Sequence, residues 1–135
     1  MVCAVEADNE AVEALTRFVS ERRLDNVRVL LAPFDDPALP DGEIDLVFLS
    51  NTYHHIENRP EYFRRVQSDL TDSSRVAILE PNEDAPAPIS LFTADGRTRS
   101  APDVRGEMGE AGYQRSATYD FLASQIFEVS RPEQP

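Results

Sequence analysis

Two adjacent histidines are the side chains best suited to proton transfer in this 135-residue chain. His54 and His55 end a polar, aromatic segment, residues 50–55, that follows the apolar run 44–49. An ordinary imidazole has a pKa of about 6.5 and can remove a proton at neutral pH, so either histidine is a candidate general base. The structural alternative is that the two histidines cap the start of a helix and that one imidazole ring is packed against neighbouring side chains. Tyr53 lines a substrate pocket or packs against that same helix.

An acidic residue ends another apolar run. Residues 2–5 predict a buried parallel strand that stops at Glu6. Nucleotide-type cofactors bind at the carboxyl ends of parallel strands, where a carboxylate accepts hydrogen bonds from ribose hydroxyls. Glu6 is therefore a candidate cofactor ligand, and the alternative is a solvated carboxylate. Glu80 and Asn82 end a later strand at the same edge of the sheet and are candidates to contact substrate, although solvent exposure is the default expectation for both.

The charge balance narrows the class of partner. The formal net charge is −12, which repels phosphate backbones and anionic lipid, so we expect neither nucleic acid nor a membrane surface as partner. All thirteen basic residues are arginines, which excludes Schiff-base lysines and the lysine of nucleotide-binding loops. Two histidines and the lone, distant Cys3 offer too few nitrogen and sulfur ligands for a metal site. A small-molecule substrate is the expected partner.

The N-terminal residues carry no basic leader, and the apolar run at the start is too short for a signal or a spanning segment. A single cysteine suits a reducing compartment. We therefore expect a cytoplasmic protein. Its length fits one domain, residues 1–135.

Strands and helices alternate along the chain in the pattern that positions these residues. Apolar spacing predicts a helix over 9–23 capped by Asp8 or Asn9, and another from about 58 to 70 followed by a return turn at 71–74. A third helix begins at a capping box, Ser100 to Asp103, and ends at Gly112. Further strands are expected at 27–31, 44–49, 75–79, 114–122 and 125–129, and a covering loop before residue 100. This order predicts an α/β, doubly wound, mostly parallel sheet with a C-terminal antiparallel hairpin.

Several segments in this order resemble the class I S-adenosylmethionine-dependent methyltransferases. Val-Cys-Ala-Val-Glu-Ala-Asp (2–8) is similar to the second strand of that family, Leu-Pro-Asp-Gly-Glu-Ile-Asp-Leu-Val-Phe-Leu-Ser-Asn (39–51) to its fourth, and Arg-Val-Ala-Ile-Leu-Glu-Pro (75–81) to its fifth. The segment 120–129 is similar to the hairpin of a bacterial branch that also carries Tyr-His-His. The resemblance implies a Rossmann-like methyltransferase fold and methyl transfer from S-adenosylmethionine.

The resemblance also assigns roles to single residues. It implies that Glu6 binds the cofactor ribose, that Ala7 lies under the adenine and that Phe34 stacks on it. Asn51 and the following residues Tyr53, His54 and His55 lie in the segment where the family places the methyl group and the incoming nucleophile. Pro33 departs from the family, which often has an aspartate there for the adenine amino group.

The main departure from the family is a missing first βα unit. Because residues 2–8 resemble the second strand of the family and the first glycine is Gly42, we expect the opening strand and its glycine-rich turn to be missing from these residues. In the family that strand lies in the middle of the sheet, in the order 3-2-1-4-5-7-6. We therefore expect one of three arrangements. Strands 2–5 and 44–49 pair directly with each other, or a strand from a missing segment, a second copy in a homodimer or a partner chain pairs with them. Otherwise their edges stay unpaired and the chain is marginally stable and aggregation-prone. Cofactor binding by residues 1–135 alone is expected to be weak or absent.

Two other functions remain open from the sequence. One is a non-catalytic interaction module that a partner chain completes by strand addition. The other is a nicotinamide-linked oxidoreductase, against which the missing glycine fingerprint and the missing lysine count.

Overall fold

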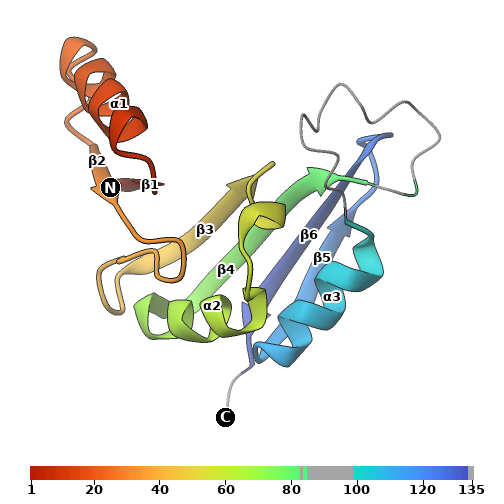
Figure 1. Cartoon of the computed structure of the whole chain (residues 1–135). Helices are drawn as coiled ribbons and strands as arrows, with labels where there is room; N and C mark the ends of the chain where they lie inside the picture. The colour runs from red at the N-terminus through yellow and green to blue at the C-terminus, as the bar shows by residue number, and fades with distance from the viewer. Residues whose placement is uncertain (83, 85–98, 134–135) are drawn as a thin grey trace. The chain divides into compact units, whose positions relative to one another are not determined.

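A computed structural model describes residues 1–82, 84 and 99–133 (Figure 1). The covering loop that the sequence predicts before residue 100 falls almost wholly outside the described residues. The chain forms two compact units, Met1–Pro40 and Asp41–Pro135. No helix among the described residues is long and apolar enough to cross a membrane.

The unit Met1–Pro40 contains a parallel strand pair and one helix. Its elements are β1 (Val2–Glu6), α1 (Asn9–Glu21) and β2 (Val27–Leu31), and β1 pairs with β2 from Val2↔Val27 to Glu6↔Leu31. Asp8 caps α1 as predicted, since its Oδ1 accepts the Ala11 amide at 2.8 Å. The helix ends two residues earlier than expected, and Arg22 forms its C-cap.

The prediction that strand 2–5 is buried is wrong for this chain. Val2 is 51% exposed and Val5 is 39% exposed. Among the described residues β1 pairs only with β2, and α1 contains no buried residue, so nothing in this unit shields both faces of the strand. An apolar strand needs cover on both faces to be buried.

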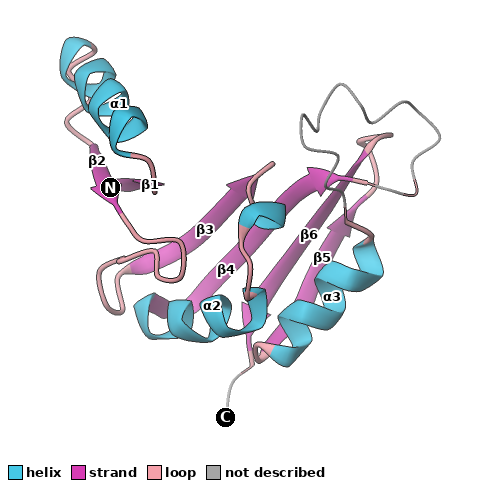
Figure 2. Cartoon of the chain, viewed as in Figure 1, coloured by secondary structure: helices cyan, strands magenta, loops and turns pink. Residues whose placement is uncertain are grey.

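The unit Asp41–Pro135 is built on a four-stranded sheet of order β3-β4-β6-β5 (Figure 2). Strands β3 and β4 are parallel, and β6 runs antiparallel to both β4 and β5. This confirms the predicted C-terminal antiparallel hairpin. The helices α2 and α3 cover the same face of the sheet (Figure 1). The bounds are β3 (Ile44–Ser50), α2 (Arg59–Val66), β4 (Leu70–Pro81), α3 (Ala101–Glu110), β5 (Tyr113–Tyr119) and β6 (Gln125–Pro132).

The expected helix end near residue 70 and the return turn at 71–74 are wrong. Helix α2 ends at Val66, a 3₁₀ turn (Gln67–Asp69) follows, and β4 begins at Leu70. Leu70 pairs with Ile44, and the register then shifts before Leu46 pairs with Arg75. The polar residues between these pairs are therefore accommodated by an irregularity inside the strand, which periodicity alone cannot distinguish from a turn.

Aromatic and aliphatic side chains fill the space between the two helices and the sheet. Phe63 and Val66 of α2, Val76 of β4 and Met108 of α3 are at most 1% exposed. The predicted capping box is present, because Ser100 Oγ accepts the Asp103 amide at 3.2 Å. These contacts fix α2 and α3 on the sheet.

The opposite face of the sheet, which we call the open face, carries the exposed apolar side chains of Leu46, Phe48 and Tyr119 and the half-buried side chains of Leu79 and Phe127. Leu46 is 58% exposed and Phe48 is 57% exposed. Among the described residues β3 pairs only with β4, and β1 and β3 belong to separate sheets. Direct pairing of these two strands, the first of the three expected arrangements, stays a prediction, since β1 and β3 belong to different units.

Candidate functional site

A buried carboxylate organises the turn that follows β3. Glu80 near the end of β4 is fully buried, and its Oε1 accepts the backbone amides of Thr52 and Tyr53, both at 2.8 Å. Its Oε2 lies 2.5 Å from Nδ1 of His54. The expectation of a solvated Glu80 is wrong, because three donors from this turn replace the water that it loses on burial.

The pairing of two parallel strands brings the turn to this carboxylate. Ser50 pairs with Leu79, so the chain leaves β3 beside the end of β4. Asn51 donates its amide to the Leu79 carbonyl at 2.9 Å and has a φ of +53°, a left-handed conformation that asparagine tolerates better than most residues. The 3₁₀ turn η1 (Tyr53–His55) begins two residues later.

The two histidines have different surroundings. His54 is 5% exposed and contacts Glu80, whereas His55 is exposed at the surface. Their ring centroids are 4.0 Å apart. An ionised carboxylate only accepts hydrogen bonds, so with Glu80 ionised and the ring neutral, Nδ1 of His54 carries the proton and Nε2 carries the lone pair. The contact between His54 and Glu80 agrees with both interpretations of His54, as a general base and as a packed ring.

Tyr53 packs against α2, as the structural alternative predicted. Its side chain is fully buried and stacks on Phe63 with 5.7 Å between ring centroids. The Tyr53 hydroxyl donates to Oε2 of Glu107 at 2.7 Å. Burial, followed by the hydrogen bond to Glu107, raises the pKa of the Tyr53 hydroxyl above its ordinary value. The phenol therefore remains a hydrogen-bond donor.

A second carboxylate, from α3, accepts a bidentate ion pair near the same turn. Arg59 at the start of α2 donates Nε and Nη2 to the two oxygens of Glu107, both at 2.7 Å, and its Nη1 donates to the Ile56 carbonyl at 2.6 Å. Burial alone would raise the pKa of Glu107, but the hydrogen bonds from Arg59 and Tyr53 outweigh it and lower that pKa. The Glu107 carboxylate is therefore held in its charged form.

Acid should weaken this contact. Because the pKa of Glu107 is lowered in the folded chain, its stabilisation is present above the ordinary value of 4.5 and is lost as the pH falls through the lower folded value. We expect the urea midpoint of the native chain to fall more steeply below about pH 4.5 than that of Glu107→Gln. Parallel losses of stability in the two proteins would contradict the expectation.

The remaining predicted cofactor residues lie together at one end of the unit Met1–Pro40. Glu6 ends β1, Ala7 follows it, and Phe34 comes after β2, whose Leu31 pairs with Glu6. Oε1 of Glu6 accepts the Ala7 amide at 2.7 Å, while no hydrogen bond to Oε2 occurs within the described residues. Phe34 is 75% exposed. A fixed carboxylate with one oxygen available suits a ribose, and an exposed aromatic ring suits a planar base.

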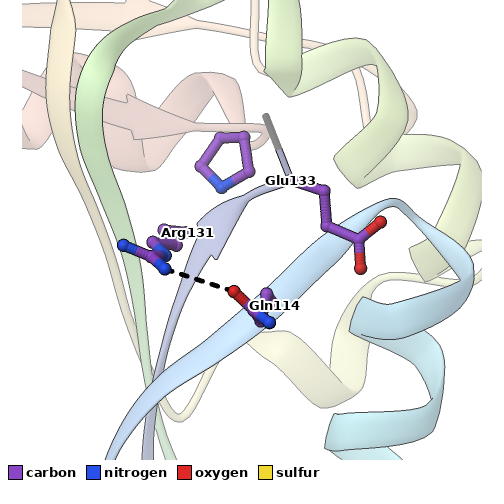
Figure 3. A pocket seen from close by; sticks show the side chains of 4 residues that line it. Gln114, Arg131 and Glu133 are labelled. Carbon is purple, nitrogen blue, oxygen red and sulfur yellow. Dashed lines mark hydrogen bonds between the residues drawn. The ribbon is translucent and has the colours of Figure 1, made fainter. Parts of the chain in front are cut away.

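A polar hollow lies at the other end of the four-stranded sheet (Figure 3). Gln114, Arg131, Pro132 and Glu133 line it, and Arg131 donates to Gln114 at 3.2 Å. Because β6 is antiparallel to β4, these residues lie at the end where β4 begins, away from Glu80. None of the predicted site residues lines this hollow.

The methyltransferase-domain family matches residues 1–78, more than half of the chain. The match includes Glu6, Ala7, Phe34, Asn51 and the turn that carries the histidines. No curated protein matches the chain.

Solved structures match nearly the whole chain in fold. A SAM-dependent methyltransferase from Aquifex aeolicus has 19% identity and a TM-score of 0.81, and the match covers 96% of this chain and 67% of that one. The N,N-8-amino-8-demethyl-D-riboflavin dimethyltransferase RosA from Streptomyces davawensis has 17% identity and a TM-score of 0.77, with 97% and 42% covered.

A third solved structure similar to this chain is the O-methyltransferase NcsB1 from neocarzinostatin biosynthesis. It was solved with S-adenosyl-L-homocysteine and 1,4-dihydroxy-2-naphthoic acid. It has 20% identity and a TM-score of 0.67, with 87% of this chain and 38% of that one covered. The chain thus spans about two thirds of the Aquifex aeolicus protein and about two fifths of the other two.

Proposed function

The chain belongs to the methyltransferase-domain family, and from this membership we propose that it forms the cofactor- and substrate-binding edge of a cytoplasmic S-adenosylmethionine-dependent methyltransferase acting on a small molecule. The observation that carries the proposal is that the family match includes both Glu6 and the turn that Glu80 holds. The match continues from Met1–Pro40 into Asp41–Pro135, which supports one partial domain over residues 1–135. It does not favour the interaction module or the nicotinamide-linked enzyme.

The residues of the unit Met1–Pro40 fit the adenosine part of the proposed cofactor. Oε2 of Glu6 is available to accept ribose hydroxyls, because Oε1 is held by the Ala7 amide. Ala7 would lie against the adenine, and the exposed ring of Phe34 would stack on it. When bound, S-adenosylmethionine supplies an electrophilic methyl group on a sulfonium. Asn51 is assigned to the same cofactor.

The turn after β3 is assigned to the methyl acceptor. We assign proton removal from an acceptor hydroxyl or amine to Nε2 of His54, because Glu80 at Nδ1 favours the tautomer with that lone pair. His55, exposed beside it, is the second candidate base, and Tyr53 holds the turn in place. Holding acceptor and methyl carbon about 3–3.5 Å apart provides much of the rate in such a reaction, with or without a base.

A titration followed by nuclear magnetic resonance tests the assignment. Adding S-adenosylhomocysteine to the chain should shift the amide signals of Glu6, Ala7 and Asn51, with a dissociation constant of about 1 mM or weaker. Glu6→Gln should weaken these shifts, whereas Glu10→Gln, an exposed carboxylate in the first turn of α1, should not. Shifts with NAD that equal or exceed those with S-adenosylhomocysteine would refute the proposed cofactor. Tight binding by calorimetry would refute the expectation of a weak site.

We further propose that another strand, from a second copy or a partner chain, pairs with the outer edge of β3. Edge strands with apolar side chains and unpaired backbone groups associate readily. Leu46 and Phe48 on the open face are more than half exposed, which supports this proposal.

Light scattering tests whether the edge of β3 is covered. The native chain should have a mass above that of the monomer at high concentration, and Phe48→Glu should shift it toward the monomer, because a charge on this face opposes desolvation. Phe34→Glu, a substitution at an exposed phenylalanine outside the sheet, is the matched control. A monomeric native chain at every concentration would contradict self-association, and the test would then turn to a different partner chain.

A further inference from the structure

Two carboxylates from different elements hold the turn that carries His54. Glu80 of β4 accepts the backbone amides of Thr52 and Tyr53, and Glu107 of α3 accepts the Tyr53 hydroxyl. Tyr53 is thus fixed at its backbone by one strand and at its hydroxyl by one helix. A fully buried side chain fixed at both ends has little freedom to move.

Arg59 holds the other end of the same turn. Its guanidinium pairs with both oxygens of Glu107 and donates Nη1 to the Ile56 carbonyl, two residues beyond His54. It also lies over the Tyr53 ring, with 5.3 Å from Cζ to the ring centroid. Only an arginine provides this planar set of donors. Glu107 is therefore linked to both sides of His54. It accepts the hydroxyl of Tyr53 directly, and it reaches Ile56 through the guanidinium of Arg59.

From this arrangement we propose that Glu107 is a positioning residue for His54, acting through Tyr53 and Arg59 to keep the imidazole against Glu80. The inference rests on the proposed function, since a fixed His54 matters for catalysis only if the turn receives the methyl acceptor. The sequence gives no signal for it: Glu107 lies 53 residues from His54, in a helix predicted only from its cap and its apolar positions.

A merely structural role for Glu107 would be to attach α3 to the rest of the unit. The chain offers a matched carboxylate for that role. Glu128 of β6 is buried, accepts Nε and Nη2 of Arg105 on α3 at 3.1 and 2.5 Å, and accepts the Thr118 hydroxyl at 2.9 Å. It also ties α3 to the sheet, but the hydrogen bonds among the described residues do not connect it to the turn.

The test compares Glu107→Gln and Tyr53→Phe with Glu128→Gln in the full chain. Long-range proton–nitrogen spectra report the tautomer of His54, and hydrogen exchange reports the Thr52 and Tyr53 amides. The first two variants should give averaged His54 ring signals and about tenfold faster exchange at these amides, while Glu128→Gln should leave both unchanged. Tyr53→Phe removes one oxygen and keeps the ring packing, so it remains informative if Glu107→Gln unfolds.

The outcomes separate this inference from the proposed function. Unchanged His54 signals in Tyr53→Phe, or equal changes in Glu128→Gln, would overturn the positioning role of Glu107. Neither measurement requires cofactor or turnover, so the positioning role can fail while binding of S-adenosylhomocysteine succeeds, and the reverse can also occur.

Discussion

Replacing Glu80 with alanine is expected to lower the free energy of unfolding by about 3–5 kcal/mol, the range for removing one partner of a buried charged contact. Glu80 is fully buried and accepts two backbone amides and the imidazole of His54. Without it these donors lose their partner in a site from which water is excluded. Because domains are stable by only about 5–15 kcal/mol, the loss should be visible as a large fall in the urea midpoint.

A conservative variant and a surface variant provide the controls for that measurement. Glu80→Gln keeps one acceptor oxygen, so it should cost less than Glu80→Ala. Glu61→Gln removes an exposed carboxylate that pairs with Arg64 along α2, and it should change stability by less than about 1 kcal/mol. A loss from Glu80→Ala no larger than that from Glu61→Gln would show that the buried contact contributes little.

Truncating Phe63 to alanine should destabilise the unit Asp41–Pro135 by about 3–5 kcal/mol through loss of buried area and creation of a cavity. Phe63 is fully buried, and its ring lies 5.7 Å from that of Tyr53 and 5.3 Å from that of Tyr62. The Phe63 carbonyl also accepts the Tyr113 hydroxyl at 2.8 Å, a backbone contact that alanine retains. The expected loss is therefore attributable to the side chain.

Thermal or urea unfolding of Phe63→Ala is best compared with Phe34→Ala. Phe34 is 75% exposed, so its truncation should change the free energy of unfolding by no more than about 0.5 kcal/mol. Similar values for the two variants would mean that the aromatic core around α2 is not the main source of stability. A smaller effect of Phe63→Leu would agree with a loss that scales with the volume removed.

Local signals in the sequence predicted most of the fold. The capping residues Asp8 and Ser100 mark helix starts because their side-chain oxygens satisfy the first free amides. Gly112 marks the end of α3 because it adopts a φ of +82°, and an added Cβ there would lie 2.9 Å from the Gln67 side chain. The boundary between α2 and β4 was wrong because its polar residues belong to a strand irregularity with no sequence signature.

The site was predictable only in part. The sequence identifies the segment 50–55 by its position after an apolar run, but it does not indicate that Glu80, 26 residues beyond His54, is buried against it. Such contacts depend on which strands are neighbours and in which register. Glu107 depends further on how α3 packs beside α2. Long-range pairing of charged groups of this kind leaves no pattern in the spacing of residues along one sequence.

The position of β6 in the sheet has a consequence for synthesis on the ribosome. In the order β3-β4-β6-β5, the strand made last lies between two strands made earlier. Until residues 125–132 leave the exit tunnel, β4 and β5 lack their shared neighbour, so this sheet cannot close during translation of the preceding segments. The nascent chain should therefore depend on chaperone protection until that final strand is inserted.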